Sequence, residues 1–384
     1  LIVLADQLGR SVGDMYAGAI IPGLLLTAIY CLYVLAVSIF QPSKVPALPP
    51  AARTLNGSPV PLLILAAGAT LLGFAAHWFL LERLESGADI WAAAIAIATA
   101  YGLALADKRM SLGLLSQLTQ RVVIVLIPPL ALIFLVLGTI FLGIATPTEG
   151  GAMGAAGALA MAMAKKRLSF RLTSEALDAT ARLSCFVLFI LIGSRIFSLT
   201  FYGINGHIWV EELFAALPGG AMGFLIAVSL LVFILGCFID FFEIAFIVVP
   251  LLAPVASKLG IDLVWFGVLL GVNLQTSFLT PPFGFALFYM RSVASARDYI
   301  DRVTGDKIAG IKTTQIYRGA VAFIVLQVVM IGITVTFPGI AIRDTGPKID
   351  PNSVEIEIPM PGFDGQGTDG IPAPPDFSTP PSFN

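Results

Sequence analysis

Long apolar segments are the feature of this 384-residue chain that most restricts its fold. A helix of about twenty apolar residues is long enough to cross the hydrocarbon layer of a membrane. Inside that layer a helix satisfies its own backbone hydrogen bonds, so helices are the favoured way to cross. The sequence therefore predicts an all-α polytopic membrane protein with about ten spans, near residues 18–40, 60–81, 90–106, 122–145, 150–164, 179–199, 221–239, 242–257, 264–290 and 319–341.

Composition supports this class and excludes others. Hydrophobic residues make up 57% of the chain and charged residues 12%, about half the charged fraction of a soluble domain. The net charge of −2 gives no basic surface for nucleic acid, so we expect no nucleic-acid partner. The chain has only two histidines, and its three cysteines lie in apolar runs without metal-binding spacing. A histidine or cysteine metal site is therefore not expected.

Basic residues predict how the chain is oriented. If each apolar segment crosses once, four loops rich in Lys and Arg fall on one face, which the positive-inside rule makes cytoplasmic. These loops contain Lys44 and Arg53, Lys108 and Arg109, the basic run 165–171, and the six Lys or Arg of 291–318. The opposite face includes residues 202–220, which contain neither Lys nor Arg. This agreement supports the predicted number of spans.

Four regions follow from these patterns. The loop 291–318 is interpreted as a solvated connector in preference to a short amphipathic helix. The C-terminal tail is rich in Pro, Gly and Asp and is expected to be disordered. The regions are 1–40 with one span, 41–118 with a proline-rich linker and two further spans, 119–341 with the remaining spans, and the tail 342–384.

Three segments combine helix breakers with polar side chains at membrane depth. They are 144–154 (IATPTEGGAMG), 236–254 (GCFIDFFEIAFIVVPLLAP) and 273–288 (NLQTSFLTPPFGFALF). Non-helical backbone persists in a membrane only where protein buries it or where it lines a wet cavity. Freed carbonyls and nearby hydroxyls form a set of hard oxygen ligands. These segments therefore predict broken helices or re-entrant hairpins that bind Na⁺ or take part in an H⁺-linked site.

Each polar residue also has a structural interpretation. Prolines in membrane helices can be simple kinks, as in the pair Pro128–Pro129. Asp240 and Glu243 lie near a span end, where snorkelling or pairing competes with ion binding. Glu149 follows Pro147–Thr148, where helix capping competes with a functional role. For Arg195, snorkelling or a structural pair is favoured over contact with an anionic substrate.

Several of these stretches resemble one protein family. GIATPTEGGAMGA at 143–155, the run 238–262 and FGVLLGVNLQTSFLTPPFGFALF at 266–288 resemble the large membrane subunit (DctM type) of tripartite ATP-independent periplasmic (TRAP) transporters. TTQIYRG at 313–319 fits the end of that family, and residues 1–26 resemble the close of its first structural half. The resemblance covers about 1–40 and 119–341.

The resemblance implies the second half of an inverted-repeat elevator transporter in the bacterial inner membrane. It implies Na⁺-coupled uptake of organic acids, such as C4-dicarboxylates, with no cofactor beyond the coupling ion. The implied partners are a small four-helix membrane subunit and a periplasmic substrate-binding protein. The candidate ion and substrate contacts that it carries over are Thr146, Pro147, Thr148, Asp240, Asn273, Thr276, Thr280, Pro281, Pro282 and Gly284, with Na⁺ expected at backbone and hydroxyl oxygens near Thr146, Thr148, Asn273, Thr276 and Thr280.

Two departures from the family pattern matter. The family's first half is expected upstream of Leu1, so residues 1–384 alone are not expected to transport. Residues 54–118 add two spans between the halves, and an even number leaves the orientation unchanged. An ion channel or another secondary transporter with broken-helix ion sites is the main alternative. An intramembrane enzyme or an ATP-driven pump is disfavoured, because no nucleophile–base pair or GxxxxGK[ST] motif appears. The substrate's identity does not follow from these residues.

Overall fold

A computed structural model describes residues 1–43, 45, 60–81, 88–110, 113–141, 143–281, 284–300 and 305–342. The predicted proline-rich linker, apart from a few residues at its start, and the predicted disordered tail lie outside these residues. Every predicted apolar segment contains a helix within the described ranges, and the segments 122–145, 221–239 and 264–290 include residues outside their helices. The helices are α1 Ile2–Gln7, α2 Val12–Phe40, α3 Val60–Leu81, α4 Ala88–Met110, α5 Gln117–Phe141, α6 Pro147–Ala164, α7 Phe170–Gly203, α8 Gly206–Ala215, α9 Gly220–Gly236, α10 Phe241–Glu243, a π-helix Ile244–Val248, α11 Val249–Lys258, α12 Leu263–Ser277, α13 Phe285–Val293, α14 Thr313–Thr336 and a 3₁₀ turn Pro338–Ile340.

The helices confirm the predicted all-α membrane class. Among the described residues, six helical stretches are long and apolar enough to cross a membrane. The apolar helices α9 and α12 are shorter, because each ends at a break in a longer apolar run. The six are Val12–Phe40, Val60–Leu81, Gln117–Ile140, Phe170–Gly203, Phe241–Lys258 and Thr313–Thr336.

Helix boundaries differ from the predicted spans in instructive places. α7 starts at Phe170, well before the predicted span at 179, and its first turn is capped by the Ser169 hydroxyl, which accepts from the Leu172 N–H. Pro128 and Pro129 lie inside α5, which continues to Phe141. This pair therefore does not end its helix, in contrast to the breaks after α9 and α12.

The loop 291–318 contains a short β-ribbon in place of the alternative short helix. Strands β1 (Tyr299–Ile300) and β2 (Lys307–Ile308) pair antiparallel. The Asp298 carboxylate accepts a hydrogen bond from the Gly310 N–H at 3.0 Å and forms an ion pair with Lys307 at 3.2 Å. These contacts hold together the base of the ribbon, whose strand residues are exposed.

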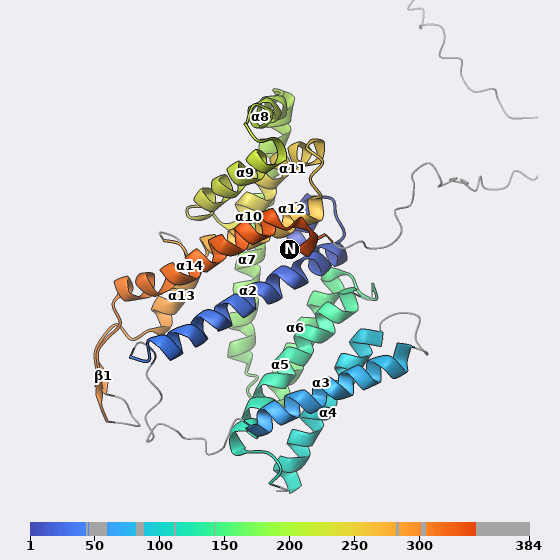
Figure 1. Cartoon of the computed structure of the whole chain (residues 1–384), viewed down its shortest axis with the longest axis vertical. Coiled ribbons are helices and arrows are strands. Elements are labelled where there is room, and N and C mark those ends of the chain that lie inside the picture. Colours follow the sequence, from blue (N-terminus) through green and yellow to red (C-terminus); the bar gives the residue numbers. More distant parts are fainter. Residues whose placement is uncertain are drawn as a thin grey trace, which may run out of the picture. The chain divides into compact units, whose positions relative to one another are not determined.

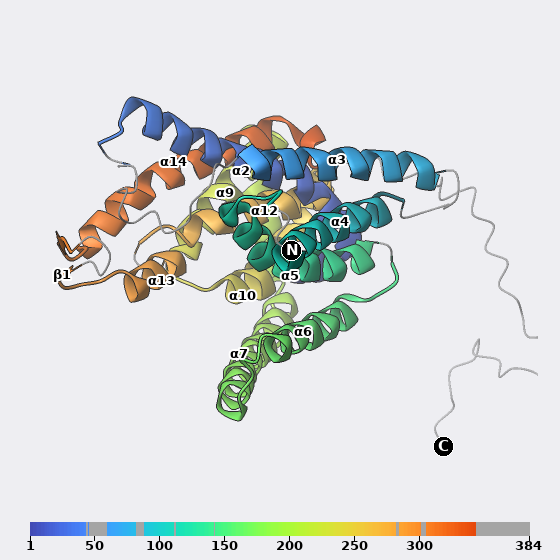
Figure 2. The same ribbon diagram turned by 90° about the horizontal axis from the view of Figure 1, so that it is seen from below.

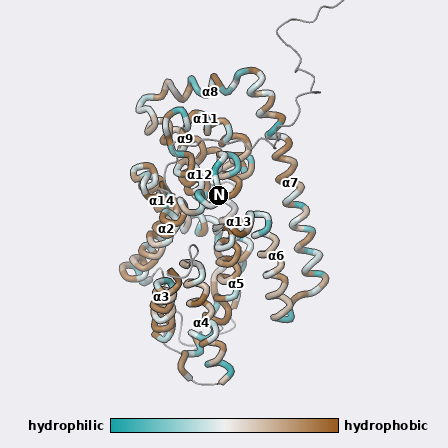
Figure 3. Tube along the Cα trace, turned by 90° about the vertical axis from the view of Figure 1, so that its right-hand side faces the viewer, coloured by the Kyte–Doolittle hydropathy of each residue, from teal (hydrophilic) through white to brown (hydrophobic). Residues whose placement is uncertain are grey.

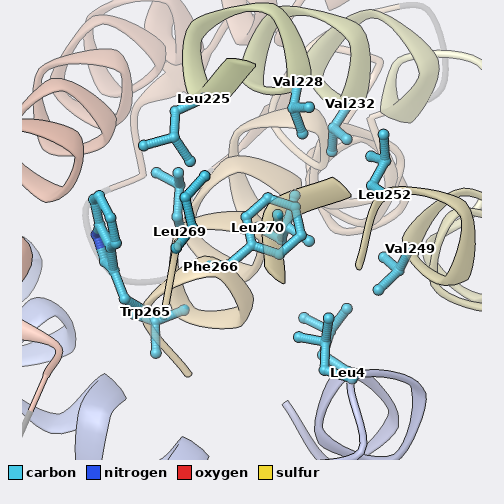
Figure 4. Packing of buried hydrophobic residues seen from close by; sticks show 14 of the residues in the cluster. Leu4, Leu225, Val228, Val232, Val249, Leu252, Trp265, Phe266, Leu269 and Leu270 are labelled. Carbon is cyan, nitrogen blue, oxygen red and sulfur yellow. The ribbon is translucent and has the colours of Figure 1, made fainter. Parts of the chain in front are cut away.

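The main hydrophobic core surrounds α12. Eleven of its fifteen residues are buried, and it packs against α1, α2, α9, α11 and α14. Figure 4 shows Leu225, Val228 and Val232 of α9 facing Phe266 and Leu270 of α12. The Trp265 indole N–H donates to the carbonyl of Thr334 at 2.8 Å, which ties α12 to α14. The helix that ends inside the apolar run 264–290 is therefore deeply buried in the protein.

A second group of helices follows the chain from α3 to α6. Successive members of this group pack against each other, and they lie together in Figure 1 and Figure 2. No residue of α3 is buried, and the colours of Figure 3 show that hydrophobic residues predominate along this helix. Gly150, Gly154 and Gly157 of α6 lie against side chains of α5, as the small residues of the segment 150–164 predicted.

Candidate functional site

The C-terminal ends of α9 and α12 lie side by side in the core. The Asn273 side-chain amide of α12 donates to the backbone carbonyl of Ser229 in α9 at 2.6 Å. Further along both helices, Gly236 approaches Ser277 so closely that a Cβ on Gly236 would lie 2.3 Å from the Ser277 Oγ. Only glycine fits at this contact. The two helices therefore run in the same direction and end close together.

Buried oxygen atoms that have no hydrogen-bond partner among the described residues gather along this contact. They are the Asn273 Oδ1 and the hydroxyls of Ser277 and Ser229. Asn273 is fully buried and Ser277 is 3% exposed. A buried polar atom without a partner costs about 1–3 kcal/mol, so such atoms are rare in folded proteins. The C-terminal ends of two helices add negative potential at the same place, which favours a bound cation.

The chain leaves α12 through a turn built from its own polar groups. The Thr280 hydroxyl donates to the Thr276 carbonyl at 2.9 Å, and the Thr280 N–H donates to the Ser277 carbonyl at 3.1 Å. A Cβ on Gly284 would lie 3.0 Å from the carbonyl oxygens of both Phe278 and Thr280. A glycine at 284 therefore lets the chain pass close to the turn before α13 begins. Pro281 lies exposed in this turn, and Pro282 lies outside the described residues.

A π-helix follows the break after α9 and ends just before Pro250. The Val249 N–H bonds to the carbonyl of Ile244, five residues back, which is the bond of a π-turn. Pro250 has no N–H, so it offers no bond to the carbonyl of Phe246 four residues earlier. Such turns are frequent at functional sites in helices. Ile244 lies beside Gly236, with its Cδ1 3.5 Å from the position of a Gly236 Cβ.

A cavity of about 620 Å³ lies on the other side of this π-helix, against α7. It is lined by Gln7, Ser194, Arg195, Ser198, Leu199, Tyr202, Phe246 and Pro250. Arg195 forms no ion pair with any residue that the structure describes. The Ser194 hydroxyl donates to the Leu191 carbonyl at 2.8 Å. A cation with several hydroxyls around it can hold a small organic anion, and the volume is in the usual range for ligand sites.

The TPTE segment forms a helix cap away from these groups. Thr146 is the N-cap of α6, and the Glu149 carboxylate accepts from the Thr146 backbone N–H at 2.7 Å and from its hydroxyl at 2.9 Å. Thr146, Thr148 and Glu149 are exposed, and Pro147 is half-buried. Within the described residues, the hydrogen bonds of Thr146 stay inside its own turn. The structure therefore gives Glu149 the capping role and does not join this segment to the end of α12.

Asp240 occupies the start of α10, beyond the break in the second segment. Its backbone N–H donates to the Glu243 carboxylate at 3.3 Å, and both residues are half-buried. No group of three or more His, Cys, Asp or Glu side chains in the described parts of the chain is placed to hold a metal ion. The acidic pair thus shapes the start of a helix.

Three residues of this site were not among those predicted from the sequence. Ser277 follows Asn273 by four residues, so helical spacing places it on the same face, and this signal was available. Ser229 is the one polar residue in the apolar run 220–236. Gly236 carried no signal, because its role depends on a contact with a helix forty residues away in sequence.

Comparison with known proteins identifies the family. A family model described as "Tripartite ATP-independent periplasmic transporter, DctM component" matches residues 1–340. The sialic acid TRAP transporter permease protein SiaT of Haemophilus influenzae is 31% identical over 42% of this chain and 26% of its own length. The C4-dicarboxylate TRAP transporter large permease protein DctM of Rhodobacter capsulatus is 35% identical over 41% of this chain and 36% of its own length. The matches thus span about a quarter to a third of these relatives. Because the family model covers most of the chain, the chain belongs to the DctM component family of tripartite ATP-independent periplasmic transporters.

Proposed function

We propose that this chain acts in Na⁺-coupled uptake of organic acids as the large permease subunit of a TRAP transporter. The observation that carries the proposal is the pair of helix ends at α9 and α12, with buried oxygens that lack partners. A buried site that is neutral, rich in oxygen and set at helix C-termini favours a hard monovalent cation.

The cation site is proposed at the end of α12. Asn273 Oδ1 and the Ser277 hydroxyl supply oxygens that are buried and unpaired. Thr276 is fully buried, and its carbonyl accepts from Thr280 in the turn that follows. A Na⁺ ion here would satisfy the unpaired oxygens and offset the negative ends of both helices.

The substrate site is proposed in the cavity beside α7. Arg195 would contact a carboxylate with two parallel N–H···O bonds, the geometry that the guanidinium favours. Ser198 and Gln7, which also line the cavity, offer neutral hydrogen-bonding groups for the rest of the molecule. A site with one cation and several neutral polar groups suits a small organic acid.

The π-helix Ile244–Val248 would link the two sites. Ile244 lies beside the Gly236–Ser277 contact, while Phe246 lines the cavity of Arg195. A cation that orders the helix ends would thereby also order one wall of the cavity. Coupling of this kind is reciprocal, so substrate must tighten Na⁺ binding by the same factor. An elevator movement of the loaded helices would then carry both across the membrane.

The partners and the substrate class in this proposal come from the family. Relatives are named for sialic acid and for C4-dicarboxylates, which are all organic acids. A small membrane subunit and a periplasmic binding protein would complete the transporter. Selection among acids would then rest both on the Arg195 cavity and on the binding protein.

Uptake in proteoliposomes tests the proposal. The complete gene product, its small subunit and its binding protein are reconstituted, and uptake of labelled C4-dicarboxylates and sialic acid is measured in Na⁺, K⁺ or choline. We expect saturable uptake that requires Na⁺ and the binding protein. Uptake that is equally fast in all three salts would reject sodium coupling, and flux that does not saturate would indicate a pore.

A further inference from the structure

A charged hollow of about 330 Å³ lies where α4 ends and α5 begins, in the part of the molecule that the transport proposal does not use. Its lining includes Lys108 of α4 and Arg121 of α5, together with Gln117 and Gln120. Neither cation forms an ion pair with a residue in the described ranges. The hollow therefore offers two uncompensated positive charges next to amide groups.

The neighbouring acidic residue, Asp107, forms its hydrogen bonds with the turn between the two helices and with the start of α5. The Asp107 carboxylate accepts from the backbone N–H groups of Leu114 at 3.0 Å and Leu115 at 2.9 Å, and from the Gln120 side chain at 2.7 Å. Asp107 is 1% exposed and does not line the hollow. Its role is to hold the turn, and the N-terminus of α5 adds further positive potential at the hollow.

An apolar cavity of about 380 Å³ lies further along the same two helices. On α4, Tyr101 and Ala94 lie seven and fourteen residues before Lys108, which places them on one face. On α5, Pro128 and Leu135 follow Arg121 at the same spacing. All four line the cavity, which starts about 10 Å from the charged hollow at 1.5 Å per residue. Figures 1 and 2 show α4 and α5 next to each other over this length.

We propose that this groove binds an anionic glycerophospholipid of the bilayer, with its phosphate at Lys108 and Arg121 and an acyl chain along Tyr101 and Pro128. The hollow lies on the face that the basic loops predict to be cytoplasmic, and basic pockets between helices on that side suit anionic headgroups. Free phosphate would leave the apolar cavity without an occupant. A partner helix would not account for two cations at one end of the groove.

Photo-crosslinking in nanodiscs tests the proposal. The complete permease with its small subunit is placed in bilayers that contain either phosphatidylglycerol or phosphatidylcholine with a photoactivatable acyl chain. The number of crosslinks in the groove, at residues 94–101 and 128–135, is divided by the number on the exposed face of α3, which serves as the reference surface. On that face Leu63 and Leu71 are 67% and 70% exposed. We expect this ratio to be roughly tenfold higher for phosphatidylglycerol, because each basic residue near the surface attracts anionic lipid.

Charge variants make the test specific. In the double variant Lys108→Gln and Arg121→Gln, the ratio of groove to α3 crosslinks should become about equal for the two lipids. The double variant Lys108→Arg and Arg121→Lys keeps both charges and should keep the preference for phosphatidylglycerol. Arg109→Gln with Lys165→Gln removes as much charge from the same face, outside the hollow, and should leave the preference intact. Equal ratios in the wild type would overturn the proposal. So would loss of the preference in inorganic phosphate, or groove crosslinks to the small subunit in place of lipid.

Discussion

Helices α12 and α3 show two ways of placing apolar sequence in one membrane protein. Eleven of fifteen residues in α12 are buried, and the helix stops at Ser277 in the middle of an apolar run. No residue of α3 is buried, and that helix continues without a break from Val60 to Leu81. In hydrocarbon, open backbone is costly, so a break persists only where protein surrounds it. Of these two helices, the buried one ends inside an apolar run and the exposed one does not.

The prolines of α5 support the same conclusion. Pro128 and Pro129 lie in a helix that packs on α4 and α6 but has many exposed residues, and the helix continues through them. Thr280 and Pro281 follow a buried helix end, where side-chain and backbone groups within the turn bond to one another. Proline is therefore tolerated in both places, but it ends a helix only where other groups replace the lost bonds.

Among the variants in these two regions, Asn273→Ala in the buried helix α12 should have the largest effect. The change removes the bond to the Ser229 carbonyl and one proposed Na⁺ ligand. We expect Na⁺-driven uptake to fall roughly ten- to hundredfold, in line with the cost of a lost buried polar contact. Gln275→Ala removes an exposed amide from the same helix and should keep most activity. Equal uptake by the two variants would contradict a role for Asn273.

Arg195→Gln tests the cavity beside α7. If Arg195 binds a carboxylate, the variant should need roughly tenfold more substrate-loaded binding protein for half-maximal uptake. Arg195→Lys should recover part of this loss, because the charge remains but the two-bond geometry does not. Arg171→Gln is the matched control, since Arg171 is exposed on the same helix and pairs with Glu175 at 2.8 Å. If Arg195→Gln leaves the half-maximal concentration unchanged, Arg195 does not bind the substrate, and snorkelling explains its position.

Gly236→Ala and Gly68→Ala compare the two regions directly. A Cβ at Gly236 would lie 2.3 Å from the Ser277 Oγ, whereas a Cβ at Gly68 in α3 has open space. We expect Gly236→Ala to destabilise the protein by about 1–3 kcal/mol. Gly68→Ala should be neutral or stabilising by up to about 1 kcal/mol. Thermal unfolding in detergent measures both, and Ser277→Gly should relieve the clash in a Gly236→Ala background. Similar unfolding for the two alanine variants would contradict the close packing of α9 on α12.

The smallest effect is expected at the β-ribbon outside both regions. Hydrogen bonds from Gly310 and Lys307 lower the pKa of Asp298. A lowered pKa in the folded state means that the ribbon gains stability above the ordinary aspartate pKa of about 3.9 and loses it as pH falls further. The protection of the ribbon amides, measured relative to their intrinsic exchange rates at each pH, should therefore be constant near neutral pH and fall below about pH 4. Asp298→Asn should remove this acid dependence, and a dependence that persists would place its cause elsewhere.

The sequence predicted the class of fold and the family, but only part of the candidate site. Apolar length and the helix breakers in 236–254 and 273–288 predicted helices and their interruptions. The family and the fold confirm a multi-pass inner-membrane protein of a transporter-permease family. The contact between Gly236 and Ser277 was not predictable, because it depends on how two helices pack. The exposure of Thr146 and the β-ribbon were likewise decided by tertiary contacts. The division into the four regions 1–40, 41–118, 119–341 and 342–384, the ion contacts and sodium coupling stay predictions.

Hydrogen–deuterium exchange at the end of α12 gives the most direct test of a Na⁺ site between the ends of α9 and α12. The complete transporter is labelled in NaCl and in KCl of equal ionic strength, and exchange is followed in the peptide that contains Asn273, Ser277 and Thr280. We expect slower exchange in Na⁺ than in K⁺ for the wild type, and equal exchange in the two salts for Asn273→Ala. Identical exchange in the two salts for the wild type would contradict a Na⁺ site between the ends of α9 and α12.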